Sequence, residues 1–419
     1  MVETAGTAMR GELANDPGPG GGARADTRLA RTARWLALLG FPASLTSPGA
    51  TVSFALVGVY GLYLLANRRD MPHDLRLVNR AMLAGYFLLL AVDVLNGGGW
   101  SNLTATAVNY LPLVALAPYA YALRSLRLVP DTLDRAMQAT IVFAVLLSAG
   151  QFGLFSEARP GGPNLNPIPY GFVIAVWAMF LLARGLETGR ASSLALVPAA
   201  LVPVFLTGSK IALVCMLVGL LCVAILWVVR HRRWYLFLAG LAGAGFALVL
   251  GYYLILGARI REFLNDLNFL FNGEQLVTRS LGDRVELARA GWQAFLERPF
   301  LGHGQAQYMD AVRAWSRPGG LDLSEFGHLH NDYLVHMVSF GVFGVVFLAG
   351  YLAVIFWLVT KSGQRPYRWA GYGLLAMVVI YMAPEVAFNM DPITGCLTLA
   401  FGAVLSAARC ETAAPEVKN

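Results

Sequence analysis

The sequence predicts an all-α polytopic membrane protein, with about twelve transmembrane helices and one large loop that contains short helices. Of the 419 residues, 57% are hydrophobic and only 14% are charged, a balance that excludes an ordinary soluble domain and a disordered chain. Apolar runs long enough to cross a bilayer, which takes about 20 helical residues, recur along the chain. The positive charge collects in alternate connections between those runs, as in multi-pass membrane proteins.

The first element is a tail, residues 1–34, and it does not read as a signal peptide. It lacks an apolar core, contains a Gly/Pro run at residues 17–22 and carries five arginines. Because arginine-rich segments are retained on the cytoplasmic side, we expect a flexible cytoplasmic tail.

Nine apolar segments follow in residues 35–258, and three more lie in residues 330–408. The predicted spans are residues 35–47, 50–66, 81–95, 103–123, 136–155, 167–183, 191–207, 210–229, 234–257, 330–360, 369–387 and 393–408. Residues 259–329 form the one long connection, and residues 409–419 form a short C-terminal tail.

The charge of the short connections predicts how the helices are oriented. One set carries many cations: Arg68, Arg69, Arg76, Arg80, Arg124, Arg127, Arg135, Arg184, Arg190, Arg230, Arg232, Arg233, Lys361, Arg365 and Arg368. The short connections of the other set carry only Arg159 and Lys210. Both termini are therefore expected in the cytoplasm, with residues 259–329 and His330 on the outer side.

The stretch at residues 328–333 is expected to be the functional centre, because it places polar residues directly before a long apolar segment. A continuous helix over residues 330–360 would be about 46 Å long, so His330 and Asn331 are expected at or above the membrane surface. Four residues share a helical face with His330: Leu334, Met337, Gly341 and Gly344. The two glycines are expected to let a neighbouring helix approach closely below the histidine.

The long loop is expected to contain a helix that begins near Asp283. Asp283 and Glu286 have the spacing of a capping box, and four apolar residues then recur at helical intervals: Val285, Ala288, Trp292 and Phe295. This face is expected to lie on the membrane or on the helix bundle. The Gly-rich turn at residues 299–304 follows, and its backbone amides are candidates for binding an anion.

Lys210 is unusual because it stands at the outer junction of two spans, where the positive-inside rule disfavours a cation. We interpret it as a phosphate-binding group. His328, His330 and Asp332 follow part of a metal-binding pattern, but Tyr333 occupies the position of the next histidine, and we expect no metal site. His336 falls on another helix face and is expected to be a packed histidine with a partner. The four cysteines form no disulfide framework or metal-ligand spacing.

Three motifs in the second half of the chain belong together. His330-Asn331 is followed, after nine residues, by Gly341 and Gly344, which fits the pattern H[N/S/Q]-x9-G-x-x-G at every position. The second motif comprises Arg284, Trp292 and the turn Pro299-Phe-Leu-Gly302-x-Gly304. The third is Thr207-Gly-Ser209-Lys210, with Lys at a position where Arg is usual. In these motifs the chain resembles the O-antigen ligase family, within the superfamily of O-antigen ligases, polymerases and related bacterial oligosaccharyltransferases.

The resemblance implies a GT-C-like fold in the bacterial inner membrane, with the active site facing the periplasm. It also implies transfer of a polysaccharide from undecaprenyl diphosphate to a sugar hydroxyl of lipid A–core. A neutral histidine suits proton removal from a hydroxyl, and cations suit a diphosphate leaving group. The expected catalytic residues are therefore His330, Arg284 and Lys210. The expected substrate-binding residues are Arg289, Arg261, His303, Asn331 and His328, with Gly302, Gly304, Gly341 and Gly344 as structural positions.

On this hypothesis the enzyme is a metal-independent, inverting, single-displacement transferase without a cofactor. Its partners are the carrier-linked donor, the lipid A–core acceptor and membrane lipids, with no nucleic acid and no obligate protein partner. Three alternatives stay open: an O-antigen polymerase, a protein O-oligosaccharyltransferase, and a transporter of anionic lipid or solute. The polymerase is disfavoured because the predicted outer segments lack an R-x10-G spacing.

Overall fold

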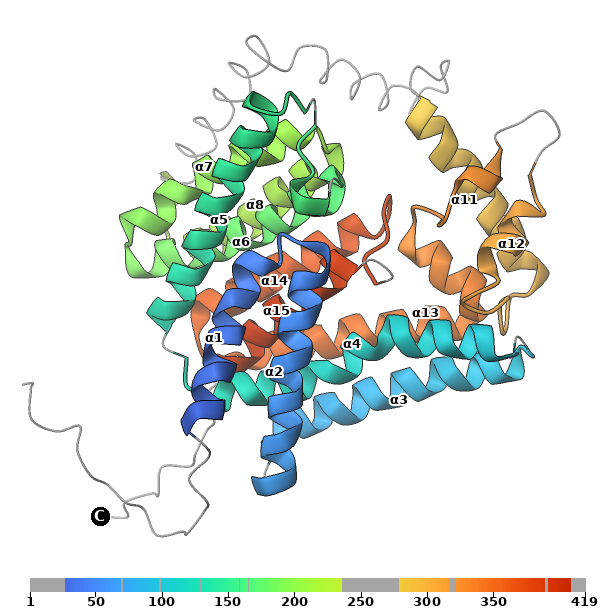
Figure 1. Ribbon diagram of the computed structural model, residues 1–419, viewed down its shortest axis with the longest axis horizontal. Helices are drawn as coiled ribbons and strands as arrows, with labels where there is room; N and C mark the ends of the chain where they lie inside the picture. The colour runs from blue at the N-terminus through green and yellow to red at the C-terminus, as the bar shows by residue number, and fades with distance from the viewer. Residues whose placement is uncertain are drawn as a thin grey trace, which may run out of the picture.

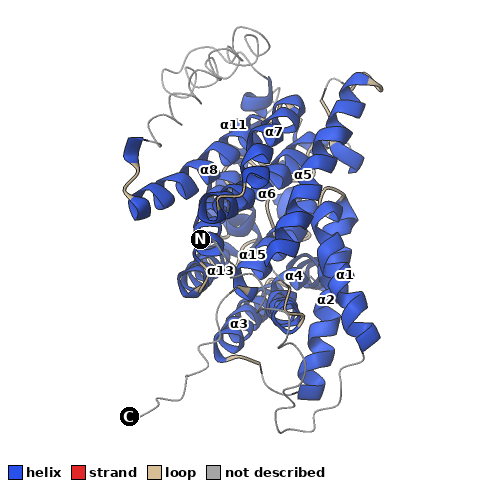
Figure 2. Ribbon diagram, turned by 90° about the vertical axis from the view of Figure 1, so that its left-hand side faces the viewer, coloured by secondary structure: helices blue, strands red, loops and turns tan. Residues whose placement is uncertain are grey.

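A computed structural model describes residues 27–68, 71–97, 99–128, 130–157, 159–164, 166–235, 279–316, 322–388 and 391–407. Within these ranges every regular element is a helix (Figure 2). The helices are α1 (Thr27–Ala43), α2 (Ser47–Arg68), α3 (His73–Leu95), α4 (Gly99–Ser125), α5 (Pro130–Gly153), α6 (Pro167–Thr188), α7 (Ala191–Thr207), α8 (Lys210–His231), α11 (Arg279–Glu297), α12 (Tyr308–Arg313), α13 (Asp332–Lys361), α14 (Arg365–Tyr381) and α15 (Asp391–Ser406). Two 3-10 turns, Gly162–Asn164 and Leu323–Glu325, complete the described elements.

Each predicted span coincides with a described helix except residues 234–257, most of which lie outside the described residues. Among the helices that the structure describes, seven are long and apolar enough to cross a membrane: α2, α3, α4, α5, α6, α8 and α13. Helices α7 and α15 are apolar but shorter. The chain is therefore a multi-pass helical membrane protein.

Helix α6 forms the centre of the bundle. It is apolar on every side, and α5, α7, α8 and α14 pack around it. Its Trp177 is fully buried and donates a hydrogen bond to Ser44 Oγ (2.9 Å), which ties α6 to the end of α1. A second group consists of α3, α4 and α13, whose long ribbons run side by side in Figure 1, with α3 packed against both of the others.

Connections that the charge pattern assigns to one side meet at one end of the bundle. Arg124, at the end of α4, pairs with Asp74 at the start of α3 (2.5 Å). Arg184, near the end of α6, pairs with Asp134 near the start of α5 (2.8 Å), and Arg190 joins the same carboxylate (3.2 Å). We call these contacts the ion-pair end.

Helix α13 is broken, which corrects the prediction of one continuous helix from His330. Gly341 has φ 60° and ψ −144° inside the helix, so the two halves meet at a kink. His330 itself precedes the helix, because Asn331 is the N-cap and its Oδ1 accepts a bond from the Leu334 amide (3.0 Å). The predicted helical face containing His330, Gly341 and Gly344 therefore does not exist.

Candidate active site

The kink in α13 binds the Gly-rich turn at residues 299–304. The break leaves the carbonyls of Val338 and Ser339 without helical donors, and the amides of His303 and Gly304 bond to them (both 2.8 Å). In return the Val342 amide donates to the Pro299 carbonyl (2.8 Å). Turn and helix thus exchange the hydrogen bonds that the kink would otherwise leave unmade.

Glycines are required where these two backbones meet. A Cβ on Gly341 would lie 2.2 Å from the Phe300 carbonyl oxygen, and one on Gly302 would lie 2.5 Å from the Ser339 carbonyl. Both also have positive φ (60° and 74°). A Cβ on Gly344 would lie 2.1 Å from the His336 carbonyl within α13 itself. The glycines therefore accommodate the kink and the turn, and the predicted close approach of a neighbouring helix is wrong.

The turn consequently does not offer its central amides to an anion, which corrects that expectation. The amides of His303 and Gly304 are both used on α13. The His303 ring is used as well, because its Nε2 lies 2.8 Å from the Ala294 carbonyl of α11. His303 therefore joins the turn to both α13 and α11, and its predicted contact with substrate stays a prediction.

His330 is held in a left-handed backbone conformation, with φ 48°. The next residue but one explains how this conformation is maintained. Asp332 is fully buried; its amide bonds to the carbonyls of Met382 (2.8 Å) and Glu385 (3.2 Å), and its Oδ2 accepts from the Ala387 amide (2.9 Å). Asp332 therefore fastens the start of α13 to the connection that follows α14, and His330 is carried along.

Glu385 is the residue that unites the site. It lies on the connection after α14, its side chain is 2% exposed, and its two oxygens have different partners. Oε1 accepts from Arg284 Nη2 of α11 (2.6 Å), and Oε2 lies 3.1 Å from His330 Nδ1. The exposed fractions of Arg284 (31%) and His330 (26%) show that both partners reach the surface. Residues distant in sequence are thereby brought into one Arg284–Glu385–His330 centre.

This geometry has a direct chemical consequence for the imidazole. A carboxylate beside Nδ1 favours the tautomer that carries its proton on that nitrogen. The Nε2 atom is then the one able to accept a proton, as in Asp–His pairs of hydrolases. The centre is therefore suited to general-base chemistry, with Arg284 beside it to stabilise negative charge.

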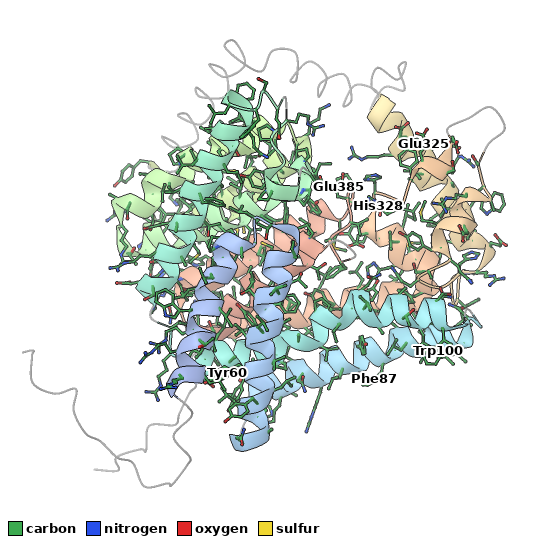
Figure 3. All side chains as sticks on the ribbon, viewed as in Figure 1. Tyr60, Phe87, Trp100, Glu325, His328 and Glu385 are labelled. Atoms are coloured by element: carbon green, nitrogen blue, oxygen red, sulfur yellow. The ribbon has the colours of Figure 1, made fainter. Side chains whose placement is uncertain are left out.

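His328 extends the centre on the other side of His330. The two imidazole ring centroids are 4.1 Å apart, and the His330 amide bonds to His328 Nδ1 (3.3 Å). Burial lowers the pKa of His328, and the neighbouring His330 adds to the shift. Figure 3 shows the labelled His328 and Glu385 near each other, between α11 and the ends of α14 and α15.

Lys210 lies at the same end of the bundle. It is the first residue of α8, after the N-cap Ser209. Cys215 Sγ contacts the Met377 carbonyl of α14 (3.5 Å). Along α8, Lys210 lies about 8 Å from Cys215. Along α14, the helix continues for about 6 Å beyond Met377 toward Glu385. Lys210 and Glu385 therefore lie at a similar height along the two packed helices. Arg159 is close by in the chain fold, donating to the Thr207 carbonyl at the end of α7 (2.9 Å).

The helix predicted in the long loop exists, but its start differs from the prediction. α11 begins at Arg279, so Asp283 lies inside it and the capping box is wrong. Of the predicted face, Val285 and Trp292 are exposed (44% and 46%), whereas Ala288 and Phe295 pack against a buried cluster. That cluster contains Leu287, Ala290 and Ala294 together with apolar residues of α13, and Gly291 lies directly against Leu329.

Two of the predicted substrate-binding arginines differ in outcome. Arg289 is engaged within the protein: it pairs with Glu286 (2.5 Å) and donates to the Trp315 carbonyl (2.7 Å). It thus braces α11 against the segment after α12. Arg261 lies outside the described residues.

His336 is the packed histidine that the sequence indicates. It is fully buried, with Nδ1 bonded to the Asp332 carbonyl (2.7 Å) and Nε2 3.1 Å from the Tyr110 hydroxyl of α4. In the part of the chain that the structure describes, no group of three His, Cys, Asp or Glu side chains has the arrangement to hold a metal ion.

Sequence reasoning missed Glu385. The residue falls inside the predicted span 369–387, for which the sequence analysis expects no site residue. A signal existed, because an acidic residue in an otherwise apolar segment usually faces a partner or a polar cavity. That signal does not say which partner, and pairing with Arg284 and His330 depends on the tertiary fold.

The fold and this centre define a multi-pass helical membrane protein with a His–carboxylate–Arg site at one end of its bundle. A family model described as O-antigen ligase matches residues 194–349. The match confirms the resemblance drawn from the sequence and supports assignment of the chain to the O-antigen ligase family. The matched segment contains Lys210, Arg284 and His330 and ends before Glu385. A search among curated proteins gave no match.

Proposed function

We propose that this protein is an O-antigen ligase that transfers a polysaccharide from undecaprenyl diphosphate to a sugar hydroxyl of lipid A–core. The proposal places the reaction on the periplasmic face of the bacterial inner membrane, with both termini in the cytoplasm. The observation that carries it is the carboxylate of Glu385, which bonds to both Arg284 and His330. These two residues belong to the motifs that the chain shares with the O-antigen ligase family.

In the proposed reaction His330 Nε2 removes the proton of the acceptor hydroxyl as its oxygen attacks the anomeric carbon of the donor. The new glycosidic C–O bond forms while the bond from that carbon to the diphosphate oxygen breaks, and the diphosphate leaves with the electron pair. One displacement inverts the anomeric centre. Glu385 stabilises the imidazolium that forms.

The leaving diphosphate carries charge that needs stabilisation rather than protonation. Arg284 and Lys210 are the proposed cations. Arg284 is suited to binding the diphosphate because its guanidinium is held in place by Glu385 and is also partly exposed. Lys210 offers a point charge instead of a bidentate fork. Since these groups can supply the positive charge, we propose that the reaction needs no divalent metal.

The test is capping of lipid A–core by purified protein in nanodiscs, with a carrier-linked glycan and EDTA present. We expect the wild type to produce capped lipopolysaccharide and His330→Ala to lose about 10²–10⁴-fold in rate. Arg284→Ala and Lys210→Ala should also lose rate. His231→Ala is the matched control, because this histidine pairs only loosely with Glu187 (3.8 Å) at the ion-pair end.

The outcomes separate the candidate functions. Glycan that lengthens on the carrier without reaching lipid A would identify a polymerase instead. Unchanged capping by His330→Ala would remove the histidine from the mechanism. Complete loss of wild-type capping in EDTA, restored by a divalent cation, would contradict metal independence.

A further inference from the structure

A polar cavity adjoins the site next to His328. Its volume is ≈ 380 Å³, within the range of roughly 300–1,000 Å³ typical of small-molecule sites. Four separate parts of the chain line it: Asn109 from α4, the segment from Gln305 to Arg313, the loop that carries His328, and Val386 on the connection after α14. The same loop positions His330 two residues later, so the cavity and the base share one support.

Gln305 has hydrogen-bonding capacity that the protein does not use. Its side chain borders the cavity and is 5% exposed, yet its Oε1 atom has no hydrogen-bond partner. Its backbone is fixed, with the amide directed at Asp93 Oδ1 (3.4 Å). A buried amide oxygen left unpaired costs free energy unless a ligand or water satisfies it. The Nε of Arg313, which also lines the cavity, is buried and unpaired in the same way.

The cavity is close to electrically neutral. Among the described residues that line it, one carries a fixed positive charge: Arg313, whose Nη1 pairs with Asp310 Oδ1 (2.9 Å) and whose Nη2 donates to the Phe326 carbonyl (2.9 Å). His328 adds little positive charge at neutral pH, because burial lowers its pKa. Neither Arg284 nor Lys210 lines this cavity. The charge distribution is therefore unsuited to a diphosphate and suited to a ligand rich in hydroxyl groups.

The lining combines polar groups with apolar surfaces. Tyr308, Met309 and Val386 contribute apolar surface, and Asn109 and Gln305 contribute side-chain amides. Pyranose rings have the same dual character, with C–H faces and a rim of hydroxyls. Amide side chains can both donate to and accept from such hydroxyls.

We propose that this cavity binds the acceptor sugar, as a neutral pyranose whose hydroxyl is presented to His330. The assignment rests on the proposed transferase function. It places the acceptor on the His328 side of the centre, whereas the donor diphosphate is held by Arg284 and Lys210. Gln305 is a substrate-binding residue on this view, and its amide is satisfied when the sugar enters.

The experiment is steady-state capping kinetics with each substrate varied in turn. Gln305→Leu removes the amide while keeping the side chain's approximate size, and Gln307→Leu makes the same change at an exposed position outside the lining. Asn109→Ala tests a second amide of the lining, which comes from α4. Loss of a single hydrogen bond predicts a rise of about threefold to tenfold in acceptor KM for Gln305→Leu and Asn109→Ala. We expect donor KM, kcat and the Gln307→Leu kinetics to stay unchanged.

Two results would overturn the proposal. Unchanged acceptor KM in both cavity variants would remove the cavity from acceptor binding, and a rise confined to donor KM would assign it to the donor glycan. Saturation-transfer NMR with free core oligosaccharide gives an independent reading, in which signal should weaken in Gln305→Leu and persist in His330→Ala. A wild type that never caps lipid A–core would overturn the proposed function, whereas normal capping with unaltered KM would overturn the acceptor site alone.

Discussion

The two ends of the bundle each contain a buried carboxylate bonded to arginine, yet they are built differently. At the ion-pair end Asp134 is fully buried and both of its partners are arginines: Arg184, which is 8% exposed, and Arg190, which is 36% exposed. At the site end Glu385 is almost as buried, but one of its partners is an arginine and the other is His330, and both reach the surface. Neither burial of the carboxylate nor exposure of a partner distinguishes a structural pair from a reactive one; the presence of an exposed imidazole, which can accept a proton, does.

The means of joining helices also differ. Side-chain ion pairs connect neighbouring helices at the ion-pair end, as Arg124 and Asp74 do. At the site end the connections are mainly backbone hydrogen bonds, between the turn at residues 299–304 and the kink of α13, and between Asp332 and the connection after α14. Backbone connections place His330 and Glu385 without using their side chains, which leaves those groups for chemistry.

The largest expected effect of this difference is at Glu385. Glu385→Gln keeps the size of the side chain but removes the charge that orients the His330 ring and stabilises its protonated form. We expect the capping rate to fall on the order of 10²–10⁴-fold, as when the acid of an acid–histidine pair is neutralised. Kinetics in nanodiscs, with the melting temperature measured in parallel, provide the check.

A structural role for Glu385 would give another pattern. In that case the melting temperature would fall markedly and the remaining folded protein would cap at the wild-type rate. Glu385→Asp supplies a second comparison, because it retains the charge and should recover part of the activity that the amide loses.

The corresponding change at the ion-pair end should have the opposite signature. Asp134→Asn removes the buried carboxylate that Arg184 and Arg190 share, and leaves them the half-exposed Asp131 at 3.9 Å and 2.5 Å. Breaking a buried ion pair costs about 3 kcal/mol or more, and the remaining contacts with Asp131 reduce that cost. Thermal unfolding in detergent should therefore shift to lower temperature. The capping rate per folded molecule should stay the same, and a selective loss of rate would show that the two ends are coupled.

The sequence predicts the helical architecture well because its signals are local. Apolar runs and charged connections determine where helices begin and end, and the structure confirms helices at the predicted spans that it describes. The packed His336 is also predictable, since its helical phase alone separates it from the polar stretch before it.

The predictions that failed depend on tertiary contacts. A helix through His330 was the simplest extension of an apolar run, but Asp332 bonds to the connection after α14 and fixes the helix start after the histidine. The start of α11 was placed at Asp283 from a capping-box spacing, whereas the helix begins at Arg279 and Asp283 lies within it. Glu385 was missed because its partners are about 55 and 101 residues away in the chain, beyond any local pattern.

The smallest expected effect tests how far the hydrogen bonds between the turn at residues 299–304 and the kink of α13 position the site. Gly341→Ala introduces a Cβ 2.2 Å from the Phe300 carbonyl at a positive φ of 60°, so either the turn must move or the kink must change. We expect a cost of about 1–3 kcal/mol in stability and a drop in capping rate, since the same segment holds His330. Gly350→Ala, farther along α13 where a Cβ would meet nothing within 4 Å, is the matched control and should leave both unchanged. If Gly341→Ala behaved like Gly350→Ala, the exchange of hydrogen bonds between turn and kink would not position the site, and the side chains of Glu385 and Asp332 would have to do so alone.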